Sequence, residues 1–103
     1  MYQISFYVPV ENALAVKNAM FEAGAGKFDN YQHCAWQTLG TGQFEPIADA
    51  DPAIGELNKL ETLEEYKIEM LCAEDSIKQV ISAMKSAHPY EQVAYSVIKM
   101  ENI

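Results

Sequence analysis

One stretch decides the fold: residues 66–97, which read YKIEMLCAEDSIKQVISAMKSAHPYEQVAYSV. Residues 66–72 alternate between apolar and mostly charged side chains, as in a strand with one buried face. The spacing then becomes that of an amphipathic helix, with apolar residues at Ile77, Val80, Ile81 and Met84. Pro89 cannot continue this helix, and alternation returns from about Val93 to Met100. The stretch predicts strand, helix and strand, with His88-Pro89-Tyr90-Glu91 as the corner between the last two.

The first half of the chain repeats this order. Residues 2–8 alternate until Pro9, and from about Asn12 the apolar residues take helical spacing until glycines 24 and 26. A second strand is expected over residues 34–44, where Gly40 and Gly42 should bend it, bulge it or end it early. Residues 45–61 have no lasting period and predict an irregular surface connection. We expect Glu74 or Asp75 to cap the second helix.

This order of elements is typical of the α+β ferredoxin-like plait (βαββαβ), a four-stranded antiparallel sheet with both helices on one face. The 103 residues fit a single domain, 1–103. Because the helices cover only one face, the other is left open. Its predicted apolar positions are Leu39, Leu71, Ile98 and either Tyr7 or Tyr95.

Composition and charge exclude several classes of partner. The net charge of −8 argues against a nucleic-acid groove or an anionic membrane surface, since both require clustered Lys and Arg. The N-terminal residues lack the basic start and apolar run of a signal peptide. The two cysteines, Cys34 and Cys72, have strand-like apolar neighbours, which favours reduced, buried thiols in a cytoplasmic protein.

Two segments carry a family resemblance: residues 24–44 and the corner from His88 to Tyr95. The chain resembles the small CutA-like, PII-like domain of the Nif-three-like protein family, whose corner reads His-Pro-Tyr-Glu-Glu-Pro-Ala-Tyr-Asp. This chain keeps six of those positions and departs at Gln92, Val93 and Ser96. The resemblance is to free-standing versions of the domain. It implies a homo-oligomer, a trimer first and a dimer second, because CutA and PII proteins close as trimers with their sheets facing inward.

The candidate site combines the corner with the second strand. We expect Tyr90 to be largely buried and Glu91 to lie at a cleft, either between subunits or beside Gly40 and Gly42. His33 and Trp36, from the same segment as the glycines, complete the candidate ligand or cleft residues. His88, Glu91 and His33 are the candidate ligands of one zinc or copper ion. The competing interpretation of His88 is an imidazolium at the carboxyl end of the second helix.

These observations favour a self-associating binding or regulatory module without a cofactor, and do not favour an enzyme. The alternative is a zinc- or copper-binding protein that uses the corner, and the third class is an enzyme acting in a cleft between subunits. The dinuclear metal centre of the longer family members needs several histidines, whereas this chain has two. The acidic connection after Gly42 disfavours polyphosphate ligands.

Overall fold

The computed structural model describes residues 1–103. The elements follow in the order β1 (Tyr2–Pro9), the short 3₁₀ helix η1 (Val10–Asn12), α1 (Ala13–Glu22), β2 (Trp36–Phe44), β3 (Glu61–Cys72), α2 (Ile77–Ala87) and β4 (Tyr95–Lys99). Neither helix has the length and apolar character needed to cross a membrane.

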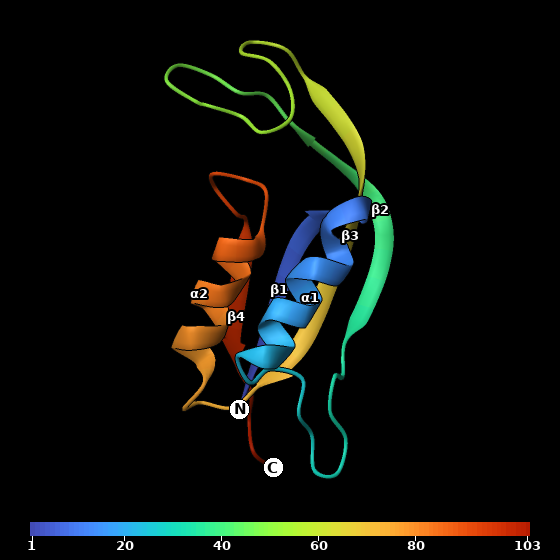
Figure 1. Cartoon of the computed structure of the whole chain (residues 1–103), viewed down its shortest axis with the longest axis vertical. Helices are drawn as coiled ribbons and strands as arrows, with labels where there is room; N and C mark the ends of the chain where they lie inside the picture. The colour runs from blue at the N-terminus through green and yellow to red at the C-terminus, as the bar shows by residue number, and fades with distance from the viewer.

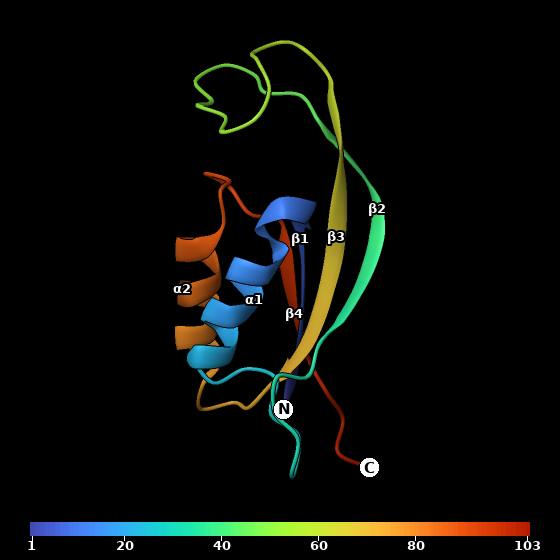
Figure 2. The ribbon, with the colours of Figure 1, turned by 45° about the vertical axis from the view of Figure 1, so that its right-hand side comes forward.

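The strands form one antiparallel sheet in the order β2-β3-β1-β4. Both helices lie on the same face of this sheet, as Figures 1 and 2 show from two directions. The predicted α+β plait is therefore confirmed. The long, continuous β1–β3 pairing at its centre places Tyr2 opposite Cys72 and Pro9 opposite Glu65.

The hydrophobic core lies between the sheet and the two helices. It is built from the inward positions of β1 and β3 and from the apolar faces of α1 and α2, as the periodicities predict. Its buried residues are Ile4, Phe6, Val8, Ala13, Val16, Met20, Ala25, Ile68, Met70, Cys72, Val80 and Met84.

Beyond the end of β1, strands β2 and β3 continue as a pair without neighbours. We call residues 41–64 the arm: the outer part of this hairpin together with the connection 45–60 at its tip. The arm lies at the top of Figure 1 and gives the molecule a length of 46 Å, against 25 and 24 Å in the other two directions. The irregular connection that the sequence predicts is thus present, at the end of a projecting hairpin.

Three expectations about local structure differ from the observed chain. Ser76, not Glu74 or Asp75, precedes α2, and it makes no side-chain cap bond. β2 and β3 pair without a bulge from Trp36 opposite Glu69 to Phe44 opposite Glu61, so two of the three outcomes expected for Gly40 and Gly42, a bulge and an early end of the strand, are wrong. Figure 2 shows that both strands curve smoothly there.

The third difference concerns the faces of β2. Directly paired residues share a face, so Trp36 and Thr38 lie on the open face beside Glu69 and Lys67. Leu39, predicted on the open face, pairs with Tyr66 on the helix side. On β2 the open face consequently carries Trp36 and Thr38 in place of Leu39.

Candidate functional site

His88 lies at the corner between α2 and β4 and is buried, with 6% of its surface exposed. Its Nε2 lies 2.7 Å from the Tyr7 carbonyl oxygen, and its Nδ1 accepts a hydrogen bond from the Tyr90 N–H at 3.1 Å. Both bonds are satisfied by the neutral tautomer that carries its proton on Nε2. Burial lowers the pKa of His88, against the opposing effects of the Tyr7 hydrogen bond and the Glu65 charge.

This geometry argues against two of the roles expected for His88. The imidazole is not a cationic cap of the helix, because burial favours its neutral form. It also offers no lone pair to a metal ion, since one nitrogen is the donor to Tyr7 and the other accepts from Tyr90. His88 therefore holds the end of β1 and the corner in a fixed relation.

Tyr90 extends from this corner toward the arm. Its hydroxyl donates a hydrogen bond of 2.7 Å to Glu65 Oε2 on β3. The centroid of its ring lies 5.9 Å from that of the Phe44 ring and 4.8 Å from that of the His88 ring. Burial, and then the hydrogen bond to Glu65, raise the pKa of the Tyr90 phenol. The phenol stays protonated and serves as a donor. Tyr90 is half-buried, less than expected.

Glu65 is the residue that sequence reasoning missed. It is 9% exposed although it is a carboxylate, and only its Oε2 has a partner, the Tyr90 hydroxyl. Its side chain lies over Gly42, where an added Cβ would overlap the carboxylate, whereas a Cβ on Gly40 would meet nothing within 4 Å. The glycine at 42 thus makes room for Glu65, and nothing in the neighbouring sequence signals that role.

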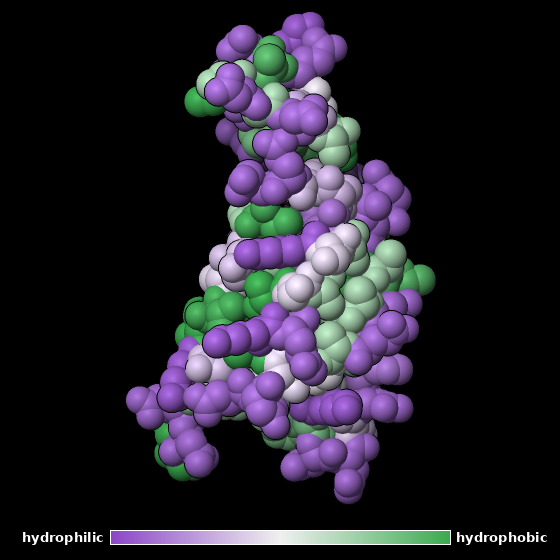
Figure 3. All heavy atoms as spheres, turned by 60° about the vertical axis from the view of Figure 1, so that its left-hand side comes forward, coloured by the Kyte–Doolittle hydropathy of each residue, from purple (hydrophilic) through white to green (hydrophobic).

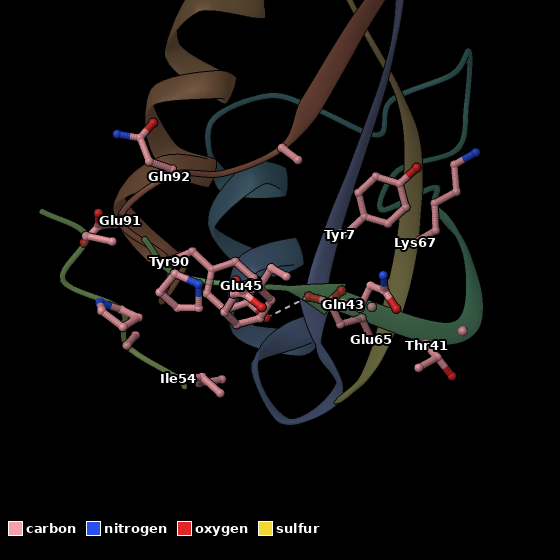
Figure 4. Close-up of a pocket in the computed structure, with 18 of the residues that line it drawn as sticks. Tyr7, Thr41, Gln43, Glu45, Ile54, Glu65, Lys67, Tyr90, Glu91 and Gln92 are labelled. Atoms are coloured by element: carbon pink, nitrogen blue, oxygen red, sulfur yellow. Dashed lines mark hydrogen bonds between the residues drawn. The ribbon is translucent and has the colours of Figure 1, made fainter. Parts of the chain in front are cut away.

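A cavity of about 790 Å³ opens where the arm meets the corner. Its walls are β2 from Thr38 to Phe44, parts of the connection from Glu45 to Ile54, the corner from Tyr90 to Ala94, and the side chains of Tyr7, Glu65, Lys67 and Glu69. Figure 4 shows Tyr90, Glu45 and Glu65 around the same space, with Glu91 and Gln92 to one side. Glu91 Oε2 accepts a hydrogen bond of 2.8 Å from the Asp51 N–H, which ties the connection to the corner. We call this space the corner cavity.

Four of the candidate residues thus come together. Tyr90, Glu91, Gly40 and Gly42 all line the corner cavity, where Glu91 is bonded to the connection at Asp51 and the two glycines belong to β2. The lining residues that were not among the candidate site residues include Tyr7, Phe44, Glu65, Lys67 and Glu69.

His33 and Trp36 lie elsewhere. The His33 ring stacks on Phe21 with the centroids 5.0 Å apart, and its loop is bonded to β3 at Leu71, opposite Gln3. Tyr7, whose carbonyl oxygen is bonded to His88, lies four residues further along β1 than Gln3, about 13 Å from Gln3. Trp36 is exposed, and its Nε1 donates to Thr38 at 3.0 Å.

The predicted metal ligands are accordingly not gathered in one chain. His33 lies near the opposite end of β1 from His88, and no group of three or more His, Cys, Asp or Glu side chains could hold a metal ion. Of the two thiols, Cys72 lies in the core, where burial raises its pKa, and Cys34 is half-buried near His33.

Comparison with known proteins supports the resemblance seen in the sequence. The chain is 42% identical over 94 residues to a GTP cyclohydrolase 1 type 2 homolog of Mycobacterium leprae, covering 91% of this chain and 24% of that protein. It is 40% identical over 99 residues to the Bacillus subtilis protein of the same name, covering 96% of this chain and 26% of that protein. The chain therefore spans about a quarter of these relatives. No family model matches it.

Solved structures agree with this picture. A Bacillus cereus protein related to NIF3 superposes with a TM-score of 0.81 at 40% identity, over 98% of this chain and 26% of that one. CutA from Archaeoglobus fulgidus, a periplasmic divalent cation tolerance protein, gives 0.69 at 18% identity, over 99% of this chain and 86% of that one. The second likeness shows the fold alone. This chain thus has an α+β fold like that of CutA, and its sequence is similar to a segment of about a quarter of the GTP cyclohydrolase 1 type 2 homologs and of the protein related to NIF3.

Proposed function

We propose that this domain is a self-associating module that binds a small molecule in the corner cavity. The observation that carries the proposal is the cavity itself, where the arm and the His-Pro-Tyr-Glu corner meet around Glu65. Its volume of about 790 Å³ falls in the range of small-molecule sites. Its lining combines aromatic and aliphatic side chains with many polar and charged ones, so a ligand could be held by both apolar contact and hydrogen bonds.

The charges of the cavity disfavour phosphorylated ligands. Four glutamates line it, Glu45, Glu65, Glu69 and Glu91, against Lys67 as the single basic residue. A triphosphate such as that of GTP, the compound in the relatives' name, would meet repulsion there. The proposal therefore assigns no GTP chemistry to this cavity.

A fragment screen by NMR tests the proposal. The ¹⁵N-labelled protein, purified without a histidine tag, is mixed with small fragments that are neutral, cationic or anionic. We expect hits to shift the amide resonances of Gly40, Gly42, Ala53 and Gln92, all from the cavity wall. Hits that cluster elsewhere, or none at millimolar concentration, would contradict the proposal.

The same sample tests the metal-binding alternative. Zn²⁺ is added stepwise, and the ring resonances of His88 and His33 are followed. We expect no stoichiometric change at His88, because both ring nitrogens are engaged. A stoichiometric shift there, lost in His88→Ala, would favour the metal-binding function instead.

A further inference from the structure

The carboxylates of the corner cavity differ in how they are neutralised. Glu69 has partners: Gln3 Nε2 donates to it at 2.7 Å, and Lys67 Nζ lies 4.0 Å away. Glu91 accepts a hydrogen bond from the neutral Asp51 N–H, and both Glu91 and Glu45 are exposed to solvent. Glu65 likewise accepts only from a neutral donor, the Tyr90 hydroxyl, but it is buried.

The second oxygen of Glu65 is the unusual group. Oε1 has no hydrogen-bond partner within the chain, although the residue is about nine-tenths buried. No fully buried side-chain oxygen or nitrogen is left without a partner, so Oε1 is accessible, and Glu65 lines the cavity. A buried carboxylate with no cationic partner is costly for a protein to maintain. A ligand that brings a positive charge would offset that cost.

Aromatic rings line the same space. The rings of Phe44 and Tyr90 pack against each other with their centroids 5.9 Å apart, and Tyr90 is bonded to Glu65. Tyr7 contributes a third ring to the cavity wall. Aromatic faces attract organic cations, which combine a charge with apolar surface. A bare metal ion would instead need several ligating groups, and no such set exists.

We infer that the corner cavity binds an organic cation, with an ammonium or guanidinium group donating to Glu65 Oε1 and its apolar part against Phe44 and Tyr90. The inference rests on the proposed function and names the ligand class of the same site. In this arrangement the Tyr90 hydroxyl holds the Glu65 carboxylate through Oε2, and the absence of a side chain at Gly42 makes space for that carboxylate. The ligand donates its hydrogen bond to Oε1.

Three probes of one shape and different charge test the inference: benzylamine, benzyl alcohol and benzoate. Each is titrated into the ¹⁵N-labelled protein while the amides of Gly40, Gly42 and Gln92 are followed. Because a charge-assisted hydrogen bond is stronger than a neutral one, we expect benzylamine to bind about tenfold more tightly than benzyl alcohol. Benzoate should bind weakest.

A pair of charge-matched variants identifies the carboxylate. Glu65→Gln keeps an acceptor for the Tyr90 hydroxyl but removes the charge, so benzylamine affinity should fall by about tenfold or more. Glu64→Gln removes the same charge from the adjacent residue, which is exposed and outside the cavity wall, and should change the affinity less than about twofold. Equal losses in both variants would overturn the assignment to Glu65.

A second variant guards against misfolding of Glu65→Gln. An added Cβ at Gly42 would overlap the Glu65 carboxylate, so Gly42→Ala should displace that carboxylate and weaken benzylamine binding as Glu65→Gln does. The inference is overturned, with the proposed function intact, if benzyl alcohol or benzoate binds the cavity as well as benzylamine does. If fragments of no charge type reach the cavity, both fail.

Discussion

At the scale of single residues, the corner is held by one histidine that connects three parts of the chain. His88 ends α2, its Nε2 bonds the end of β1 through Tyr7, and its Nδ1 orders the backbone of Tyr90. Tyr90 then reaches Glu65, which belongs to β3. The neutral state of His88 is required for this connection, because only a neutral ring both donates and accepts.

We predict that stability falls at mildly acidic pH through His88. The folded state lowers the pKa of His88, so below the ordinary value of about 6.5 the unfolded chain binds more protons than the folded chain. The loss of stability caused by His88 is absent above about pH 7.5. It grows as the pH falls, by at most about 1.4 kcal/mol per pH unit. Urea unfolding from about pH 7.5 to about pH 5.5 measures it. His88→Gln, which retains a donor for Tyr7, should flatten the dependence; an unchanged slope would contradict the prediction.

A second prediction concerns the Tyr90 hydroxyl. Tyr90→Phe removes the donor to Glu65 and leaves a nine-tenths buried carboxylate without its partner. We expect the free energy of unfolding to fall by about 1–3 kcal/mol. Tyr31→Phe is the matched control, since Tyr31 is 72% exposed, and should change stability by no more than about 0.5 kcal/mol. Chemical denaturation compares the two; similar small losses would show that the Tyr90–Glu65 bond contributes nothing.

At the scale of elements, periodicity explains both what could be predicted and what could not. The strands and helices with one buried face, such as β1 and α2, were located because burial imposes a period of two or 3.6 residues. The face of Leu39 was misassigned because nearly every residue of β2 is exposed, so no hydrophobic pattern specifies its register. Glu65 escaped notice for a related reason: its burial depends on Tyr90 and Gly42, which are distant in sequence.

The arm gives a prediction at this scale. Residues 45–60 contribute nothing to the hydrophobic core, and Phe44 is paired directly with Glu61. Replacing 45–60 with Asn-Gly, the two-residue turn that suits an antiparallel hairpin, should preserve cooperative unfolding. We expect stability within about 1 kcal/mol of the original, because the lost Asp51–Glu91 bond is offset by a shorter loop.

The same replacement removes one wall of the corner cavity. Fragments that shift Gly40 and Gly42 in the full chain should no longer do so, and this is checked on the same NMR resonances. A shortened chain that fails to fold would show that the connection stabilises the body. One that folds and still binds fragments would place their site elsewhere.

At the scale of the whole molecule, the open sheet face is mixed rather than uniformly apolar. Gln3, Lys67 and Glu69 form a bonded polar group on it, while Trp36 and Ile98 lie on the edge strands at either side, 69% and 58% exposed. From the α2 side of the molecule, Figure 3 shows hydrophobic residues on the body as patches between hydrophilic ones, with a mainly hydrophilic arm. Such exposed aromatic and aliphatic groups beside unpaired strand edges favour association with another copy.

The last prediction is therefore that the chain self-associates through this face. We expect light scattering at micromolar concentration to give the mass of a trimer, with a dimer as the second choice. A standard interface buries about 800 Å² per partner, so a new charge within the buried area should be disruptive: Trp36→Glu and Ile98→Glu should both shift the mass toward one chain. Leu14→Glu is the matched control, because Leu14 is 67% exposed but lies on α1, on the other side of the sheet. If Leu14→Glu dissociates the assembly and the other two do not, the contact lies on the helices. A mass near that of one chain for the unaltered protein would refute self-association altogether.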